Sequence, residues 1–205
     1  LPKTSVLGHE LIVALFSYFY SVAVEACDKR LINNFYCALF HDLPEVLTRD
    51  IISPVKHSIS GLEHIVNKYE IELINTSILP LVPDQIKDHF LYLLGMIKES
   101  ENYKKNEFNN RIKNEHMPQI VENMAKYNSD RYEPIDGMAL KACDSLAAFT
   151  EAALSKSYGI KSRELENGIK IKDNYKNKPD INGINFLNIM QEFENYLNNF
   201  EDTQK

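Results

Sequence analysis

Glycine is scarce in this sequence, and so are the alternating apolar and polar runs that are typical of β-strands. Only seven of the 205 residues are glycine. Long segments instead repeat apolar residues at the spacing of an α-helix. The scarcity of strand signals argues against a fold built mainly of β-sheet. We therefore predict an all-α protein, organised as a single-domain helical bundle.

Cysteine and positive charge are also limited. The three cysteines, Cys27, Cys37 and Cys143, form no CxxC pair and lie in apolar helical runs. They are predicted to be reduced core residues of a cytoplasmic protein. The 23 basic residues are outnumbered by 29 acidic ones, for a net charge of -6. This balance argues against nonspecific binding to nucleic-acid phosphates, whereas a small anionic ligand needs only a metal or a few cations.

No uncharged run reaches the length that a membrane span requires. The apolar stretch over residues 11–24 holds 14 residues, and a spanning helix needs roughly 20. No basic segment precedes it, which argues against a secretory signal. We predict a buried helix at this position and no membrane partner.

Helical patterns divide the chain into two predicted parts. Residues 1–158 are expected to form the main domain, and residues 159–205 a helical C-terminal extension. The predicted helices cover residues 4–28, 31–41, 62–74, 83–97, 135–155 and 186–200, with Thr4 or Ser5 and Asp136 as candidate N-caps. The polar segment around 98–116 is expected to be an insertion that extends a helix or forms a loop.

The segment FHDLPEVLTRDIISPVK, residues 40–56, carries the most informative pattern. His41 and Asp42 offer an imidazole and a carboxylate, two ligand types that suit a borderline divalent metal. The pair alone is weak evidence, because a helix C-terminus also favours histidine. Glu45 follows His41 by four residues and would share its face on a continuous helix.

Two further candidate ligands lie far from this segment in the sequence. His9 stands near the start of the first apolar helix, and Asp144 interrupts an otherwise apolar run. Burying an ionised carboxylate against an apolar face is costly unless it is paired or bound to a metal. The alternatives for Asp144 are an ion pair with Lys141 or a position that faces solvent.

The order His9, His41-Asp42, Asp144 resembles the H…HD…D signature of the HD-domain phosphohydrolase superfamily. Within it, the resemblance is closest to the YfbR-like 5'-deoxynucleotidases, whose pattern HDxxEVLTGDxPTPVK is similar to HDLPEVLTRDIISPVK here. The lead-in TSVLGHE resembles the S-V-x-x-H stretch of that branch, and ALKACDSLAAFTEA resembles its A-D-x-L-x-A helix. The similarity covers residues 3–56 and 138–155. It implies a helical bundle of the HD-domain type.

The resemblance implies a metal-dependent phosphohydrolase that acts on (deoxy)nucleoside 5'-monophosphates. The implied metal ligands are His9, His41, Asp42 and Asp144, around one divalent ion, which could be Mn, Co, Mg, Zn or Fe. The implied catalytic residues are Glu45, which orients or deprotonates a metal-bound water, and Asp50. The implied substrate-binding residues are Asp50, Ile51, Ile52, Ser53 and Lys56. A metal that polarises phosphate and acidifies its water agrees with this chemistry.

The sequence departs from the family pattern at two places. Pro44 is expected to kink the chain after Asp42, which weakens the argument that Glu45 shares a helix face with His41. A new helix that starts at Pro44 is the alternative, and it could preserve the geometry. The Arg-Trp substrate-recognition segment of the family would precede Leu1. The preference for deoxyribose therefore rests on the resemblance alone.

Two other functions stay open, an HD-type phosphodiesterase or alarmone hydrolase and a noncatalytic module that binds a metal or nucleotide. Alarmone enzymes carry Glu-Asp where this chain has Glu45-Val46, which disfavours that reaction. His89 and His116 are candidate ligands for a second metal, whereas His57 and His64 are expected at the surface. The predicted partner is a small phosphate ester, a nucleotide. A homodimer is compatible with the aromatic cluster at Phe16, Tyr18, Phe19 and Tyr20, which is expected to lie in the core or at a dimer face.

Overall fold

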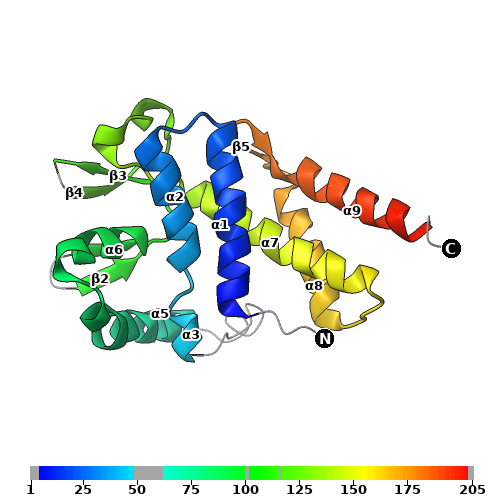
Figure 1. Ribbon diagram of the computed structural model, residues 1–205, viewed down its shortest axis with the longest axis horizontal. Helices are drawn as coiled ribbons and strands as arrows, with labels where there is room; N and C mark the ends of the chain where they lie inside the picture. Colours follow the sequence, from blue (N-terminus) through cyan, green and yellow to red (C-terminus); the bar gives the residue numbers. More distant parts are fainter. Residues whose placement is uncertain (1–4, 49–61, 100–101, 116, 203–205) are drawn as a thin grey trace.

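Three helices form the centre of the molecule. In the computed structural model, which describes residues 5–48, 62–99, 102–115 and 117–202, α1 (Val6–Ala23) and α2 (Asp28–Phe40) lie side by side, and α7 (Gly137–Ser157) crosses them (Figure 1). The predicted all-α bundle is confirmed. Its core lies where small residues let the helices approach closely, as at Ala14, Ala38 and Ala142, all fully buried.

Local capping explains where α1 and α2 begin. The Ser5 hydroxyl accepts a hydrogen bond of 3.0 Å from the Gly8 amide, so Ser5 is the N-cap of α1 as predicted. Helix α1 ends at Ala23, before the predicted residue 28, because Glu25 adopts a left-handed conformation with φ 51°. The amide of Lys29, in the first turn of α2, donates a hydrogen bond of 2.8 Å to the carboxylate of Asp130, about a hundred residues away.

The environment of two cysteines is confirmed and that of the third is corrected. Cys37 and Cys143 are buried and free, as predicted. Cys27 is only half-buried, because it stands at the N-cap position of α2, outside the helical run.

A second, smaller apolar cluster packs beside the central helices. It gathers Ile74, Leu91, Leu94 and Met96 around α5 (Leu62–Leu73) and α6 (Lys87–Leu93). A π-turn over Ile74–Ile78 continues α5, and 3₁₀ turns cover Leu79–Leu81 and Asp84–Ile86. The predicted helix over 83–97 is therefore too long. It ends at Leu93, and Gly95, with φ 71°, turns the chain into a strand.

The polar segment around 98–116 was predicted as a helix extension or loop. The helix extension is wrong, and a loop is found at residues 106–110. Most other described residues of the segment lie in antiparallel pairs of β1 (Met96–Glu99) with β2 (Asn102–Lys105) and of β3 (Arg111–Asn114) with β4 (Met117–Ile120). The buried guanidinium of Arg111 organises this region by donating hydrogen bonds to the carbonyls of Tyr92, Leu93, Asn106, Glu107 and Asn109. Such long-range bonds leave no periodic signal in the sequence.

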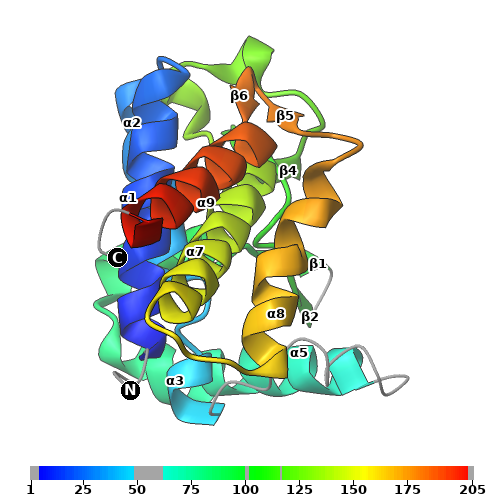
Figure 2. The ribbon, with the colours of Figure 1, turned by 90° about the vertical axis from the view of Figure 1, so that its right-hand side faces the viewer.

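Two C-terminal helices pack against α7. These are α8 (Arg163–Lys170), which was not predicted, and α9 (Phe186–Asp202), which was (Figure 2). Between them lie a 3₁₀ turn, Ile171–Tyr175, and the strand pair β5 (Asp180–Ile181) and β6 (Ile184–Asn185). Phe186 and Met190 of α9 belong to the same hydrophobic cluster as α1, α2 and α7.

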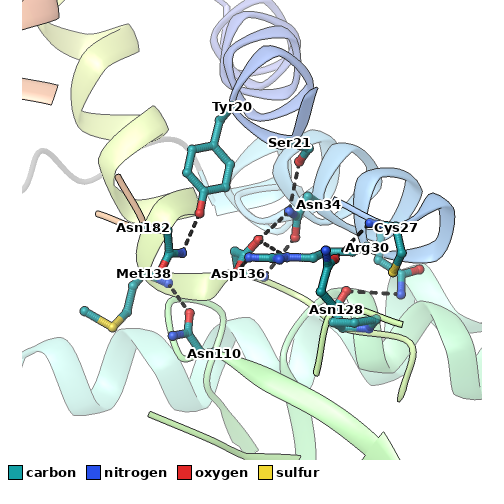
Figure 3. A network of polar contacts seen from close by, with 12 residues as sticks. Tyr20, Ser21, Cys27, Arg30, Asn34, Asn110, Asn128, Asp136, Met138 and Asn182 are labelled. Carbon is teal, nitrogen blue, oxygen red and sulfur yellow. Dashed lines mark hydrogen bonds and ion pairs between the residues drawn. The ribbon is translucent and has the colours of Figure 1, made fainter. Parts of the chain in front are cut away.

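Asp136, the residue that precedes α7, was predicted to cap this helix and has a different role. Asp136 occupies the N-cap position but makes no side-chain capping bond. Its carboxylate instead accepts bonds of 2.7 and 2.8 Å from Arg30 and one of 2.9 Å from Asn34 (Figure 3). The Asp136 amide donates to the Asn34 side-chain oxygen, and Asn34 also donates to Ser21. This buried network ties α1, α2 and α7 together at one end.

Helix α1 is more exposed than predicted. By length and composition it could cross a membrane, with a mean hydropathy of 1.5, and 33% of its residues are buried in the structure. One face packs against α2 and α7. The opposite face carries exposed apolar side chains, namely Leu7, Leu11, Leu15, Tyr18, Phe19 and Val22.

Candidate metal centre

The three central helices bring together three of the four predicted metal ligands. His9 comes from the first turns of α1, His41 from the residue that follows α2, and Asp144 from the middle of α7. Each offers one ligand atom, and these atoms all lie within 4.8 Å of one another. The Asp144 Oδ1 atom lies 3.0 Å from Nε2 of His9 and 4.0 Å from Nε2 of His41. Two imidazoles and a carboxylate at this spacing can hold a divalent metal.

His41 turns its Nε2 atom toward this cluster. The ring is fully buried, and its Nδ1 lies 2.7 Å from the carbonyl oxygen of Ala38. Because a carbonyl only accepts, Nδ1 carries a proton, and Nε2 is the nitrogen that can offer a lone pair once its own proton leaves. Among the described residues, Nε2 makes no aligned hydrogen bond, although Asp42 Oδ2 lies 3.1 Å away. A buried nitrogen held in this way fits a metal ligand.

His9 is oriented by two carboxylates of α7. Its Nε2 faces Asp144, and its Nδ1 lies 3.1 Å from Oε1 of Glu151. Glu151 follows Asp144 by seven residues, so two helical turns place both carboxylates on one face of α7. Sequence reasoning missed Glu151, and this spacing is the signal that could have found it.

The electrostatics of the cluster favour a cation. Burial alone lowers the pKa of His9, but hydrogen bonds to Asp144 and Glu151 override it and raise the pKa to about 10. Burial likewise opposes protonation of His41, yet the charge of Asp42, followed by that of Asp144, raises its pKa to about 9. Burial acts to raise the pKa of Asp144, but its bond with His9 and the charge of Lys141 lower it overall. In the metal-free protein, protons on the imidazoles supply the positive charge that a metal would bring.

Lys141 lies at the exposed edge of the cluster. Its ammonium donates to Asp144 Oδ2 at 3.1 Å and lies 4.4 Å from the centre of the Phe108 ring. The pairing of Asp144 with Lys141 that was the alternative to a metal role is therefore present. It uses one carboxylate oxygen, and the other faces the two histidines.

Glu10 is a second residue that sequence reasoning missed. It is fully buried, and neither carboxylate oxygen makes an aligned hydrogen bond among the described residues. Burial raises its pKa to about 7. The charge of His41 and the backbone amide of Asp42 oppose the rise, and the charge of Asp42 adds to it. The only sequence signal was a glutamate directly after His9 within an apolar helix.

The segment after His41 turns sharply, as Pro44 predicts. Helix α2 ends at Phe40, and the short α3 (Glu45–Thr48) begins at Glu45. The Glu45 amide donates a 2.8 Å hydrogen bond to the carbonyl of Asp42 across this turn. The Glu45 side chain is 9% exposed. The turn thus separates Glu45 from α2, and the continuous helix first considered is absent.

The remaining predicted residues fall into two groups. The candidates Asp50, Ile51, Ile52, Ser53 and Lys56, together with His57 and His116, lie outside the described residues. Within the part that is described, the only group of three or more acidic, histidine or cysteine side chains with metal-binding geometry is the one at His9, His41 and Asp144. His89 is paired with Glu133 at 3.5 Å instead. His64 is exposed, as predicted, and lines a separate cavity of about 720 Å³ between α5 and β2.

Comparison with known proteins agrees with this geometry. The sequence model of the HD domain family matches residues 1–172. A search of curated proteins and a search of solved structures each found no match. HD domains are in general metal-dependent phosphohydrolases, and His9, His41 and Asp144 could form the metal site of one. Since the match covers most of the chain, this protein belongs to the HD domain family.

Proposed function

We propose that this protein hydrolyses the phosphomonoester of nucleoside 5'-monophosphates, with deoxynucleotides as preferred substrates. One observation carries the metal-dependent part of the proposal. The buried Nε2 of His41 lacks an aligned hydrogen bond and faces Asp144 and His9. The choice of a nucleotide rests on the resemblance of HDLPEVLTRDIISPVK to the 5'-deoxynucleotidase pattern.

In the proposed site, His9, His41, Asp42 and Asp144 hold one divalent ion. When bound, the ion polarises a phosphate oxygen and acidifies a water molecule. Asp42 fits this set because its Oδ2 lies 3.1 Å from the ligand nitrogen of His41. Among the described residues no second cluster is available for another ion, which favours a mononuclear monoesterase over a binuclear phosphodiesterase.

Glu45 is the proposed general base. Its backbone amide donates to the carbonyl of Asp42, so Glu45 lies directly beside a proposed metal ligand, and the residue is only 9% exposed. The carboxylate takes a proton from the attacking water as the new P–O bond forms and the bond to the 5'-oxygen breaks. The proton ends on the leaving oxygen, which gives a nucleoside and inorganic phosphate.

The test is a screen of the purified protein with Mn²⁺, Co²⁺ or Mg²⁺ against ribo- and deoxyribonucleoside 5'-monophosphates. Para-nitrophenyl phosphate serves as a generic substrate. We expect metal-dependent phosphate release, faster with deoxynucleotides. Replacing Glu45→Gln should lower kcat by about 10²–10⁴-fold. The matched control is Glu166→Gln, an exposed position on α8. Absence of phosphate release from every nucleotide, or a Glu45→Gln variant as active as the wild type, would contradict the proposal.

A further inference from the structure

Helix α1 presents an exposed face that is apolar and uncharged. The exposed positions of this helix are Leu7, Gly8, Leu11, Leu15, Tyr18, Phe19, Val22 and Ala23, and none of them carries a charge. The six large side chains among them recur at helical spacing and form a continuous stripe, which consists of Leu7, Leu11, Leu15, Tyr18, Phe19 and Val22. A stripe of this kind, 40 to 64% exposed at its large side chains, is unusual for a surface that faces water only.

We propose that a second copy of this chain covers the stripe, with the two α1 helices packed antiparallel around a twofold axis. Leu15 lies near the middle of the stripe and so nearest the axis, and Leu7 of one copy meets Val22 of the other. An uncharged stripe is self-complementary, because no like charges meet across the axis.

The surface area that a dimer would bury agrees with a second copy of the chain as the partner. The six large side chains of the stripe are 40 to 64% exposed, so at about 200 Å² for a whole large side chain they would bury roughly 600 Å² per copy. Two copies together would bury about 1,200 Å², the lower end of specific interfaces. Residues that flank α1 would add to this value.

Charge argues against a membrane as the occupant. Helices that lie in a membrane surface carry lysine or arginine beside the apolar face. Helix α1 contains neither residue, and the chain has a net charge of -6. An anionic lipid surface would therefore repel the protein.

The experiment is sedimentation of the full chain at micromolar concentration. We expect twice the chain mass of 23.7 kDa. The Leu15→Glu variant should sediment as a monomer, because two carboxylates would meet at the axis. Its circular dichroism should show that it is folded. The matched control is Leu81→Glu, at a position 83% exposed on a 3₁₀ turn, which should remain a dimer. In a second arm, Leu15→Cys should form a disulfide-linked dimer under mild oxidation, and Leu81→Cys should not.

Several results would overturn this proposal. They are a monomeric wild type, a Leu15→Glu variant that stays dimeric, or flotation of the wild type with lipid vesicles as a monomer. The test does not depend on catalysis, so it is independent of the proposed function.

A separate observation assigns a role to Glu151. The geometry points to Glu151 as a positioning residue for the metal ligand His9, and this rests on the proposed metal site. Its Oε1 lies 3.1 Å from His9 Nδ1. If Nδ1 donates its proton to Glu151, Nε2 keeps a lone pair on the side of Asp144. A carboxylate that accepts from the far nitrogen fixes the ring orientation of a ligand histidine and strengthens its bond to a metal.

The test is titration of the metal-free protein with Mn²⁺ by calorimetry, which needs no turnover. Glu151→Ala should weaken binding about 10–100-fold, and Glu151→Gln, which keeps an acceptor oxygen, should weaken it less. The control Glu166→Ala should bind as the wild type does, and circular dichroism should show that the metal-free Glu151 variants are folded. Wild-type affinity in Glu151→Ala would overturn the role. A wild type that binds Mn²⁺ but hydrolyses no nucleotide would leave this role intact and refute only the proposed activity.

Discussion

Helices α1, α2 and α7 meet in two buried polar clusters that differ in one respect. At Asp136, the carboxylate is fully engaged by Arg30 and Asn34. At Asp144, two turns further along α7, the neighbouring His41 nitrogen and the Glu10 carboxylate have no aligned hydrogen bond within the described structure. A satisfied buried network stabilises a fold, whereas unsatisfied buried groups cost stability. We infer that the Asp136 cluster stabilises the fold and that the Asp144 cluster is built to bind a ligand.

The largest expected effect is on the Asp136 cluster. Replacing Asp136→Ala leaves the buried Arg30 guanidinium unpaired, which should lower the free energy of unfolding by about 3–5 kcal/mol. Urea unfolding followed by circular dichroism measures it, with the exposed Asp84→Ala as the control. A loss below about 1 kcal/mol, the scale of an exposed ion pair, would refute the structural role of this cluster.

The next effect concerns the Asp144 cluster. Mn²⁺ at 100 times its dissociation constant should raise the free energy of unfolding by about 2.7 kcal/mol, because only the folded chain brings the ligands together. The Asp136→Ala variant should show the same increment if it remains folded. Equal stability of the wild type with Mn²⁺ and with a chelator would count against a metal role.

The smallest effect isolates Glu10 in the metal-free protein. Replacing Glu10→Gln removes a buried carboxylate without changing its shape, and should stabilise the protein by about 1–3 kcal/mol at neutral pH. The pKa of Glu10 is raised from 4.5 to about 7 in the folded state. Below pH 4.5 both states are protonated, and between 4.5 and 7 only the folded state keeps the proton.

The wild type should therefore lose stability relative to Glu10→Gln as the pH rises through this interval, and the difference should level off above about pH 7. Unfolding of both proteins over this range in the presence of a chelator measures the difference. A difference in unfolding free energy between the two proteins that does not change with pH would show that the Glu10 carboxylate finds a partner in solution.

The sequence predicted the parts of the site that depend on residue type and order. His9, His41 and Asp144 were identified from the H…HD…D order, and the turn after Asp42 from Pro44. Glu151 and Glu10 were missed because their roles arise from packing. Glu151 meets its partner His9, 142 residues away in sequence, only when α1 packs against α7.

The same reason explains where the fold departed from expectation. Asp136 was predicted as a helix cap from its neighbours in sequence, but its partner Arg30 lies 106 residues away. The strands around Arg111 are only four residues long, which is too short for an alternating pattern to stand out. Long, periodic segments such as α5 and α9 were predicted almost to the residue.

The most direct test of the metal centre is the stoichiometry and affinity of Mn²⁺ binding to the wild type and to Asp144→Asn, measured by calorimetry on the metal-free protein. We expect one ion per chain for the wild type. Binding should be at least about 100-fold weaker for Asp144→Asn, because the carboxylate that faces both His9 and His41 is lost. Equal affinity in the two proteins, or no binding to the wild type, would contradict it.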